Sequence, residues 1–212
     1  MEMIFLTVFA VAAPVYLASL FCRRGVFQSI GKACLMPLVL AVYITGANRF
    51  FFPVALALVF GWLGDILLLK INDFRFFRLG LASFLLGHLC YVFTMFYFAE
   101  TVEIPALVIS LAAAIPLGIG MYILVRPNRE MRIPVMVYEA VILFMAAAAV
   151  QFCIARGPSS GALVLAGSLS FLVSDSLLAF FTFRGAPCFG SFAVMLTYLT
   201  AQFCITLGLC VA

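Results

Sequence analysis

Residues 51–69 read FFPVALALVFGWLGDILLL, a run of nineteen residues in which Asp65 is the only charged side chain. A helix of about 20 apolar residues crosses the ~30 Å hydrocarbon core of a bilayer, so this run has the length of a membrane span. A carboxylate at the bilayer centre costs about 2.5–3.5 kcal/mol even on the most lenient insertion scale, so an acid there indicates a function. The stretch therefore predicts a transmembrane helix that carries a functional carboxyl group.

The rest of the chain continues this hydrophobic pattern. Apolar residues make up 67% of the 212 residues and charged residues 9%, and no stretch has the composition of a soluble domain. We expect one all-α, polytopic membrane domain over residues 1–212, because runs this long and apolar satisfy their backbone groups in lipid only as helices. The eight expected spans are residues 3–21, 33–47, 51–69, 79–98, 104–125, 134–155, 161–183 and 189–211.

Basic residues divide unevenly between the two sides of this eight-span arrangement. Arg49 and Arg156 fall on one side, and the other ten of the twelve Lys and Arg residues fall on the opposite side. These ten are Arg23, Arg24, Lys32, Lys70, Arg75, Arg78, Arg126, Arg129, Arg132 and Arg184. Since positive charge marks cytoplasmic loops, we expect both termini on the non-cytoplasmic side, in the inner membrane if the source is bacterial. Topology accounts for the net charge of +4, so no nucleic-acid partner is expected, whereas contact with anionic lipid head groups is a second role for these residues.

The second half of the chain repeats part of the first at a constant offset of 110 residues. The corresponding positions are Gly64-Asp65-Ile66-Leu67-Leu68 with Ser174-Asp175-Ser176-Leu177-Leu178, Gly80 with Gly190, and His88 with Tyr198. The repeat pairs spans three and four with spans seven and eight. Helices four apart in an alternating bundle run in the same direction, so this is a parallel internal repeat, with an acid in each copy.

Small side chains are assigned structural roles. Gly80, Ser83 and Gly87 recur at positions i, i+3 and i+7, a spacing that lets a neighbouring helix approach closely. The seven cysteines are scattered without a Cys-x-x-Cys pair, and the chain has one histidine. Structural metal sites cluster such ligands, so we expect no metal and no cofactor.

Further polar residues are predicted at mid-depth or in the cytoplasmic half of the membrane. They are His88 and Tyr91 on the fourth span, Tyr138 and Glu139 on the sixth, Ser174 on the seventh, and Tyr198 and Gln202 on the eighth. We hypothesise that they share one cavity with Asp65 and Asp175. In the structural alternative, His88 is a packing residue, Tyr198 and Gln202 bond between helices, and Ser174 donates to its own helix.

The three membrane acids also have structural interpretations to be weighed. Asp65 is near enough in sequence to Lys70 for an ion pair at the membrane boundary. Glu139 has Arg132 or a lipid head group as an alternative partner. Asp175 has no basic residue within two turns of its own helix, so a functional role is favoured for it.

At these positions the chain resembles a known family. Gly64-Asp65-Ile66-Leu67-Leu68 and Gly87-His88-Leu89-Cys90-Tyr91 are similar to the G-D-x-x-L-L and G-H-x-x-Y patterns of the YhhN-like family, which includes the lysoplasmalogenases of animal membranes. Ser174-Asp175-Ser176-Leu177-Leu178-Ala179 resembles its S-D-x-x-L-A motif, and Tyr198-Leu199-Thr200-Ala201-Gln202 its Y-x-x-A-Q motif. Lys32 and Tyr138 also fall where that family commonly has such residues.

The resemblance implies a membrane hydrolase that acts on a lysophospholipid. Its reaction would cleave the vinyl-ether bond of a lysoplasmalogen, giving a fatty aldehyde and a glycerophospho-ethanolamine or glycerophospho-choline. The expected partners are therefore this substrate and membrane lipids.

Two buried carboxyl groups suit that chemistry. An acid protonates the outer alkene carbon of a vinyl ether, and a carboxylate stabilises the resulting oxocarbenium ion and activates water, as in glycoside hydrolysis. We hypothesise that Asp175 is the general acid and that Asp65, nearer to water and Lys70, is the ionised base, with the reverse assignment left open. The remaining assignments are His88, Tyr198 and Gln202 to position water or the glycerol oxygen, and Lys32, Arg78 and Arg132 to hold the phosphate.

Two other functions fit parts of the pattern. A proton-coupled transporter or lipid-binding scaffold would use Asp65 and Asp175 as proton relays. An intramembrane aspartyl protease would also use two membrane aspartates, and residues 61–65 loosely resemble its G-x-G-D motif. The partner Tyr-Asp motif of such proteases is missing, because Ser174 precedes Asp175, and the two acids lie four helices apart.

Overall fold

A computed structural model describes every residue except 1, 22–24 and 72, so the expected cytoplasmic Arg23 and Arg24 lie outside the described residues. The helices are α1 (Glu2–Ser19), α2 (Val26–Gly46), α3 (Phe52–Leu67), the short 3-10 helix η1 (Leu68–Lys70), α4 (Phe74–Ala99), α5 (Ile104–Val125), α6 (Arg132–Arg184) and α7 (Gly190–Cys210). Within the described part of the chain there is no strand. Six of these helices are long and apolar enough to cross a membrane, and Met3–Ser19 is a shorter apolar helix. The expected all-helical fold with several helices of membrane-spanning length is confirmed, whereas the count of eight spans and the parallel repeat stay predictions.

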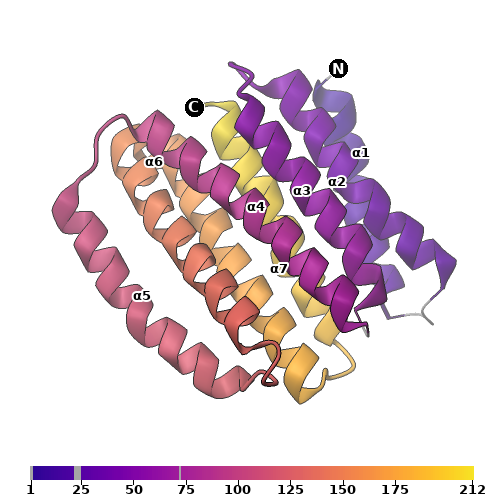
Figure 1. The fold of residues 1–212 in the computed structure, drawn as a ribbon. Helices are drawn as coiled ribbons and strands as arrows, with labels where there is room; N and C mark the ends of the chain where they lie inside the picture. Colours follow the sequence, from indigo (N-terminus) through magenta and orange to yellow (C-terminus); the bar gives the residue numbers. More distant parts are fainter. Residues whose placement is uncertain (1, 22–24, 72) are drawn as a thin grey trace.

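Helix α6 folds back on itself. At 53 residues it would be about 80 Å long if straight, far more than the ~30 Å hydrocarbon core. The helical backbone breaks at Gly157, whose φ of 74° favours glycine, and Pro158 follows. The two arms lie side by side (Figure 1) and touch closely, since a Cβ on Gly161 would come 2.4 Å from the Cα of Cys153. The expected spans 134–155 and 161–183 lie on these two arms.

The helix ends differ from the expected span ends on the side that carries most of the basic residues. Helix α2 begins at Val26 rather than near residue 33, and α4 begins at Phe74 rather than near residue 79. Asp73 caps α4, because its Oδ1 accepts a hydrogen bond of 2.9 Å from the backbone N–H of Arg75. Hydropathy marks only the part of a helix that lies in hydrocarbon, so it misses polar first turns. As a consequence, Lys32 lies inside α2 rather than at its start.

Five helices carry the candidate residues, and four of them, α3, α4, α6 and α7, pack together in the middle of the bundle. Helix α6 packs against α4 and α7, and α3 packs against α4. Helix α5 lies at one edge and α1 near the opposite edge (Figure 1), and α5 is almost wholly exposed apart from its contact with α6. A helix so apolar and so exposed is expected to face lipid.

The stripe of small residues on α4 packs against α3, as the sequence predicted. The hydroxyl of Ser83 donates to the carbonyl of Phe60 at 2.6 Å. A Cβ on Gly87 would lie 3.1 Å from the carbonyl oxygen of Ala57, so only glycine fits there without a shift. Small residues thus bring α3 and α4 into close contact.

The two arginines that the charge distribution set apart from the others share one end of the bundle. Arg49 and Arg156 line the same polar pocket, together with Ala212. The C-terminus and the start of α1 lie at this end (Figure 1). This placement agrees with an uneven division of the basic residues between two membrane faces.

Candidate functional site

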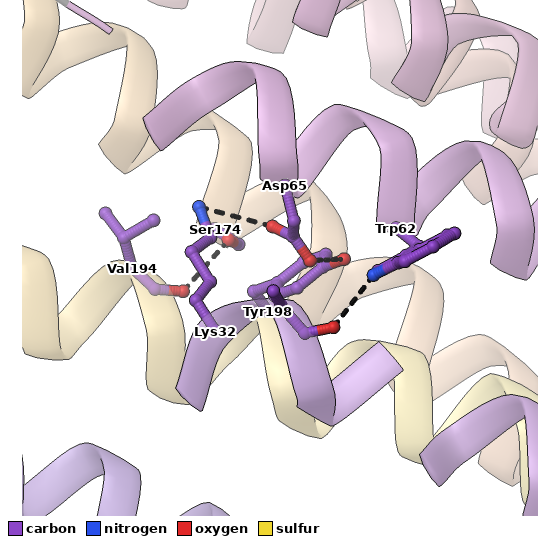
Figure 2. Close-up of polar contacts among 7 residues, drawn as sticks. Lys32, Trp62, Asp65, Ser174, Val194 and Tyr198 are labelled. Carbon is purple, nitrogen blue, oxygen red and sulfur yellow. Dashed lines mark hydrogen bonds and ion pairs between the residues drawn. The ribbon is translucent and has the colours of Figure 1, made fainter. Parts of the chain in front are cut away.

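Asp65 on α3 is held in a buried ion pair. Its side chain is 3% exposed, and its Oδ1 lies 3.2 Å from the Nζ of Lys32 on α2. Its Oδ2 accepts a hydrogen bond of 2.8 Å from the hydroxyl of Tyr198 on α7. Figure 2 shows the carboxylate between these two partners. Each carboxylate oxygen of Asp65 therefore has a partner from a different helix.

This arrangement corrects two expectations for Asp65. The expected boundary partner, Lys70, instead places its Nζ 4.8 Å from the ring centroid of Phe76. Asp65 is also less exposed than Asp175, at 3% against 10%, so it is not the acid nearer to water. Lys32, expected to hold a substrate phosphate, contacts Asp65 instead.

Trp62 fixes α2 against α3 beside this ion pair. Its indole Nε1 donates a hydrogen bond of 2.8 Å to the backbone carbonyl of Ala33, the residue next to Lys32 (Figure 2). Trp62 and Asp65 are three residues apart on α3 and so lie on one face of that helix. Apart from the presence of a single tryptophan, no sequence feature indicated this contact.

Asp175, on the second arm of α6, lies in a separate polar cluster. Its Oδ2 accepts a hydrogen bond from the hydroxyl of Tyr138 on the first arm. The Nε2 of His88 on α4 lies 3.0 Å from that hydroxyl and 3.5 Å from the same carboxylate oxygen. Three of the expected site residues, His88, Tyr138 and Asp175, therefore lie in contact with one another. Tyr138 and Asp175 come from opposite arms of the α6 hairpin.

Aromatic rings separate the two acid clusters. Phe171 makes edge contacts with His88 at 4.5 Å and with Tyr198 at 5.5 Å between ring centroids. Phe84 packs on Tyr198 and Phe171 at 5.8 and 6.4 Å. A Cβ on Gly64 would lie only 2.5 Å from the Phe84 ring, so this glycine gives the ring its space. Nothing in the sequence distinguished Phe171 from the other 23 phenylalanines.

The remaining candidates tie helices together. The hydroxyl of Tyr91 donates to Oε1 of Gln202 at 2.7 Å, which joins α4 to α7 as in the interhelical alternative. Ser174 donates to the carbonyl of Val194 on α7 at 3.1 Å, so the expectation that it bonds to its own helix is wrong. Tyr91, Gln202 and Ser174 are all buried.

A mostly apolar pocket opens beside Asp175. It lies between α4, α5 and both arms of α6 and has a cavity volume of about 40 Å³. The polar residues in its wall are Tyr138, Glu139, Asp175 and Ser176, and its apolar wall includes Leu81, Phe84, Met121 and Ile142. Asp65 is not in this wall, so of the two aspartates only Asp175 lines this pocket. Among the described residues, no three His, Cys, Asp or Glu side chains come together as a metal site.

The pairing of the acids crosses between the two halves of the chain. Tyr198 occupies the position that corresponds to His88 at the 110-residue offset. Tyr198 bonds to Asp65, whereas His88 lies against Asp175. Each acid thus contacts the aromatic residue from the opposite half.

The sequence model of the YhhN family matches residues 24–209. The chain belongs to the YhhN family. The match covers both acid clusters and the whole pocket wall, so this site is part of the YhhN domain. No curated protein and no solved structure matches the chain, so the chemistry of this YhhN protein is argued from its own site.

Proposed function

We propose that this protein is a membrane-embedded hydrolase that cleaves the vinyl-ether bond of lysoplasmalogens. The observation that carries the proposal is the carboxylate of Asp175, held by Tyr138 and His88, in the wall of a largely apolar pocket. The pocket is concave and mostly apolar with a few polar side chains in its wall, which is the usual character of a small-molecule site. An acid facing an apolar pocket suits a lipid with a reactive group near its chain.

The pocket wall supports a substrate with one long hydrocarbon chain. Leu81, Met121 and Ile142 offer the chain an apolar surface, and the lipid-facing helix α5 forms the outer wall. The exposed Arg78 lies next to the wall residue Phe77, and is proposed to hold the phosphate together with the exposed Arg132, at the start of α6. Guanidinium groups suit phosphate because they donate two parallel hydrogen bonds.

The reaction begins when a carboxylic acid of the site gives its proton to the outer alkene carbon, and the C=C electron pair forms the new C–H bond. The oxygen lone pair then forms an oxocarbenium ion, which a neighbouring carboxylate stabilises. Water adds to the cationic carbon, and the carboxylate accepts a proton from that water. The resulting hemiacetal breaks its bond to the glycerol oxygen and releases a fatty aldehyde and a glycerophospho-base.

Asp175 is proposed as the carboxylate that stabilises the cation and activates water. Its bonded partner Tyr138 fixes its orientation towards the pocket. Asp65 is the second acid of the proposal. Its charge is balanced by Lys32, and it acts through Tyr198, whose ring packs on Phe171 beside His88.

The membrane arrangement is proposed to have eight crossings, with α1 as the first and each arm of α6 as one. Spans three and four would then repeat as spans seven and eight in parallel. The Arg49–Arg156 end, with both termini, would face away from the cytoplasm, in a bacterial inner membrane. The pocket wall includes Phe77 near the start of α4, Val125 at the end of α5 and Val135 near the start of α6. In the proposed arrangement these helix ends lie on the cytoplasmic side, so the pocket would open towards the cytoplasmic leaflet.

The first test is aldehyde release by the purified protein in detergent. A lysoplasmalogen and the matching saturated ether lipid would be compared for wild type, D175N and D65N. The exposed Asp73 provides the matched control D73N, since asparagine caps a helix as well as aspartate does.

Aldehyde from the vinyl ether alone, lost in D175N and retained in D73N, is the expected result. We expect D65N to lose part of the activity. Absence of aldehyde from monodisperse wild-type protein would refute hydrolysis, and full activity in D175N would refute the role of Asp175.

A proton-coupled transporter is the second candidate, favoured by one observation. His88, Tyr138 and Asp175 form a hydrogen-bonded chain, as proton relays in membranes do. Lipid uptake into proteoliposomes without product would favour this function. An aspartyl protease is disfavoured, because its two carboxylates share one site, whereas Asp65 and Asp175 bond to different partners.

A further inference from the structure

Glu139 is the acid in the pocket wall for which the described residues supply no hydrogen-bond partner at its buried oxygen. It lies on the face of α6 that also presents Val135, Tyr138 and Ile142 to the pocket. Its Oε1 is buried and has no hydrogen-bond partner among the described residues. Its expected alternative partner, Arg132, lies seven residues earlier, about 10 Å along the helix at 1.5 Å per residue.

The three membrane acids differ in what surrounds them. Asp65 has a lysine and a tyrosine as partners and lies outside the pocket wall. Asp175 accepts a hydrogen bond from Tyr138, which stabilises a carboxylate. The buried oxygen of Glu139 has no such partner among the described residues. An unpaired carboxylate in an apolar wall is far more costly than a neutral carboxylic acid. The two pocket acids therefore differ in their contacts: Asp175 is held by a hydrogen-bond donor, whereas the buried oxygen of Glu139 has no partner among the described residues.

We propose that Glu139 is the catalytic proton donor to the outer alkene carbon of the vinyl ether, with Asp175 as the carboxylate that takes the proton from water. This inference rests on the proposed hydrolase function. It replaces Asp65 as the second reacting acid and makes Asp65 a positioning residue.

The proton and electron balance closes with these two acids. The alkene electron pair takes the Glu139 proton to form a C–H bond, and the ether oxygen donates its lone pair to form the oxocarbenium ion. Asp175 then takes one proton from the attacking water. When the hemiacetal collapses, its hydroxyl proton returns to Glu139 and the Asp175 proton goes to the departing glycerol oxygen. Both acids end in their starting states, and no other reagent is needed.

The test compares E139Q and E139D with wild type, using kcat and KM for a lysoplasmalogen. Glutamine keeps the size of the side chain but has no acidic proton to give. The control E130Q changes an exposed acid in the loop before α6, outside the pocket wall. Binding of the saturated ether analogue is measured in parallel, because this ligand fills the site without reacting.

We expect E139Q to lower kcat by about 10²–10⁴-fold, the usual contribution of general acid catalysis, with KM and analogue binding within about twofold of wild type. E139D should recover part of kcat because it restores an acid in a shorter side chain, and E130Q should match wild type. If E139Q does not fold, an E139D protein with reduced kcat and unchanged KM would support the proposal, and one with raised KM alone would overturn it.

The outcomes separate this inference from the function on which it rests. A wild-type enzyme that releases aldehyde while E139Q keeps its kcat overturns the role of Glu139 alone. Raised KM with unchanged kcat assigns Glu139 to binding and also overturns its role as proton donor. A wild-type protein that binds the analogue but makes no aldehyde overturns both.

Discussion

At the residue scale, the two aspartates have the same sequence setting but different partners. Both lie in an apolar helix before two leucines, and the sequence predicts from this that both are functional. The structure gives Asp65 a lysine from α2, and gives Asp175 a tyrosine and a histidine. Partners on other helices depend on which helix faces meet, and hydropathy does not encode that.

The ion pair between Lys32 and Asp65 is expected to stabilise the fold. In K32M the buried carboxylate of Asp65 loses its counter-charge, so the free energy of unfolding should fall by about 3–5 kcal/mol. The double variant K32M/D65N should regain most of this loss, because asparagine carries no charge and can still accept from Tyr198. Thermal unfolding in detergent measures both. A double variant no more stable than K32M would contradict a charge-pair role.

Tyr138 is expected to support catalysis rather than folding. In Y138F the hydroxyl that bonds Asp175 and contacts His88 is lost, while the ring that packs there remains. We expect kcat for the vinyl ether to fall roughly 10- to 100-fold as the carboxylate loses its fixed orientation, with little change in KM. The control Y97F changes an exposed tyrosine in the pocket at the opposite end. Equal activity in Y138F and Y97F would remove Tyr138 from the mechanism.

At the element scale, the sequence predicted the apolar segments well and their contacts poorly. Each expected span lies on a helix, because about 20 apolar residues have few other structures available in lipid. The start of α2 at Val26 was missed, whereas the two segments on either side of the break at Gly157 were predicted as separate spans. The first turns of α2 include Gln28, Ser29 and Lys32, and hydropathy carries little information about helical residues of this kind.

The α6 hairpin is expected to depend on Gly161. In G161A the new methyl group would come 2.4 Å from the Cα of Cys153, which is backbone and cannot rotate away. The two arms would have to separate, at a cost of about 1–3 kcal/mol. The control is G120A on α5, where nothing lies within 4 Å of the added group. A lower unfolding temperature for G161A but not for G120A is expected, and equal temperatures would show that the arms are not closely packed.

At the scale of the whole molecule, the internal repeat predicted which positions correspond but not how the halves meet. The 110-residue offset aligns His88 with Tyr198 and Asp65 with Asp175. The contacts then cross, so that Tyr198 lies against Asp65 and His88 against Asp175. With these contacts, α7 lies beside α3, and α4 lies beside α6. The pocket is on the α5 side of the bundle, because its wall is formed mainly by α4, α5 and α6. The acid that lines the pocket beside Asp175 is then Glu139, from a helix arm outside the repeat.

The crossing number and orientation can be tested together with two single-cysteine variants in an otherwise cysteine-free protein. One keeps the exposed native Cys188 between α6 and α7, and the other carries T101C between α4 and α5. If each arm of α6 crosses the membrane, three crossings separate these positions and place them on opposite sides. A membrane-impermeant maleimide should then label T101C in intact cells, and Cys188 only after the cells are permeabilised. The opposite pattern would reverse the orientation that the basic residues predict. Labelling of both positions from one side would mean that α6 crosses only once. Its two arms would then not lie side by side in the membrane, and the pocket between them, with the proposed site, would be contradicted.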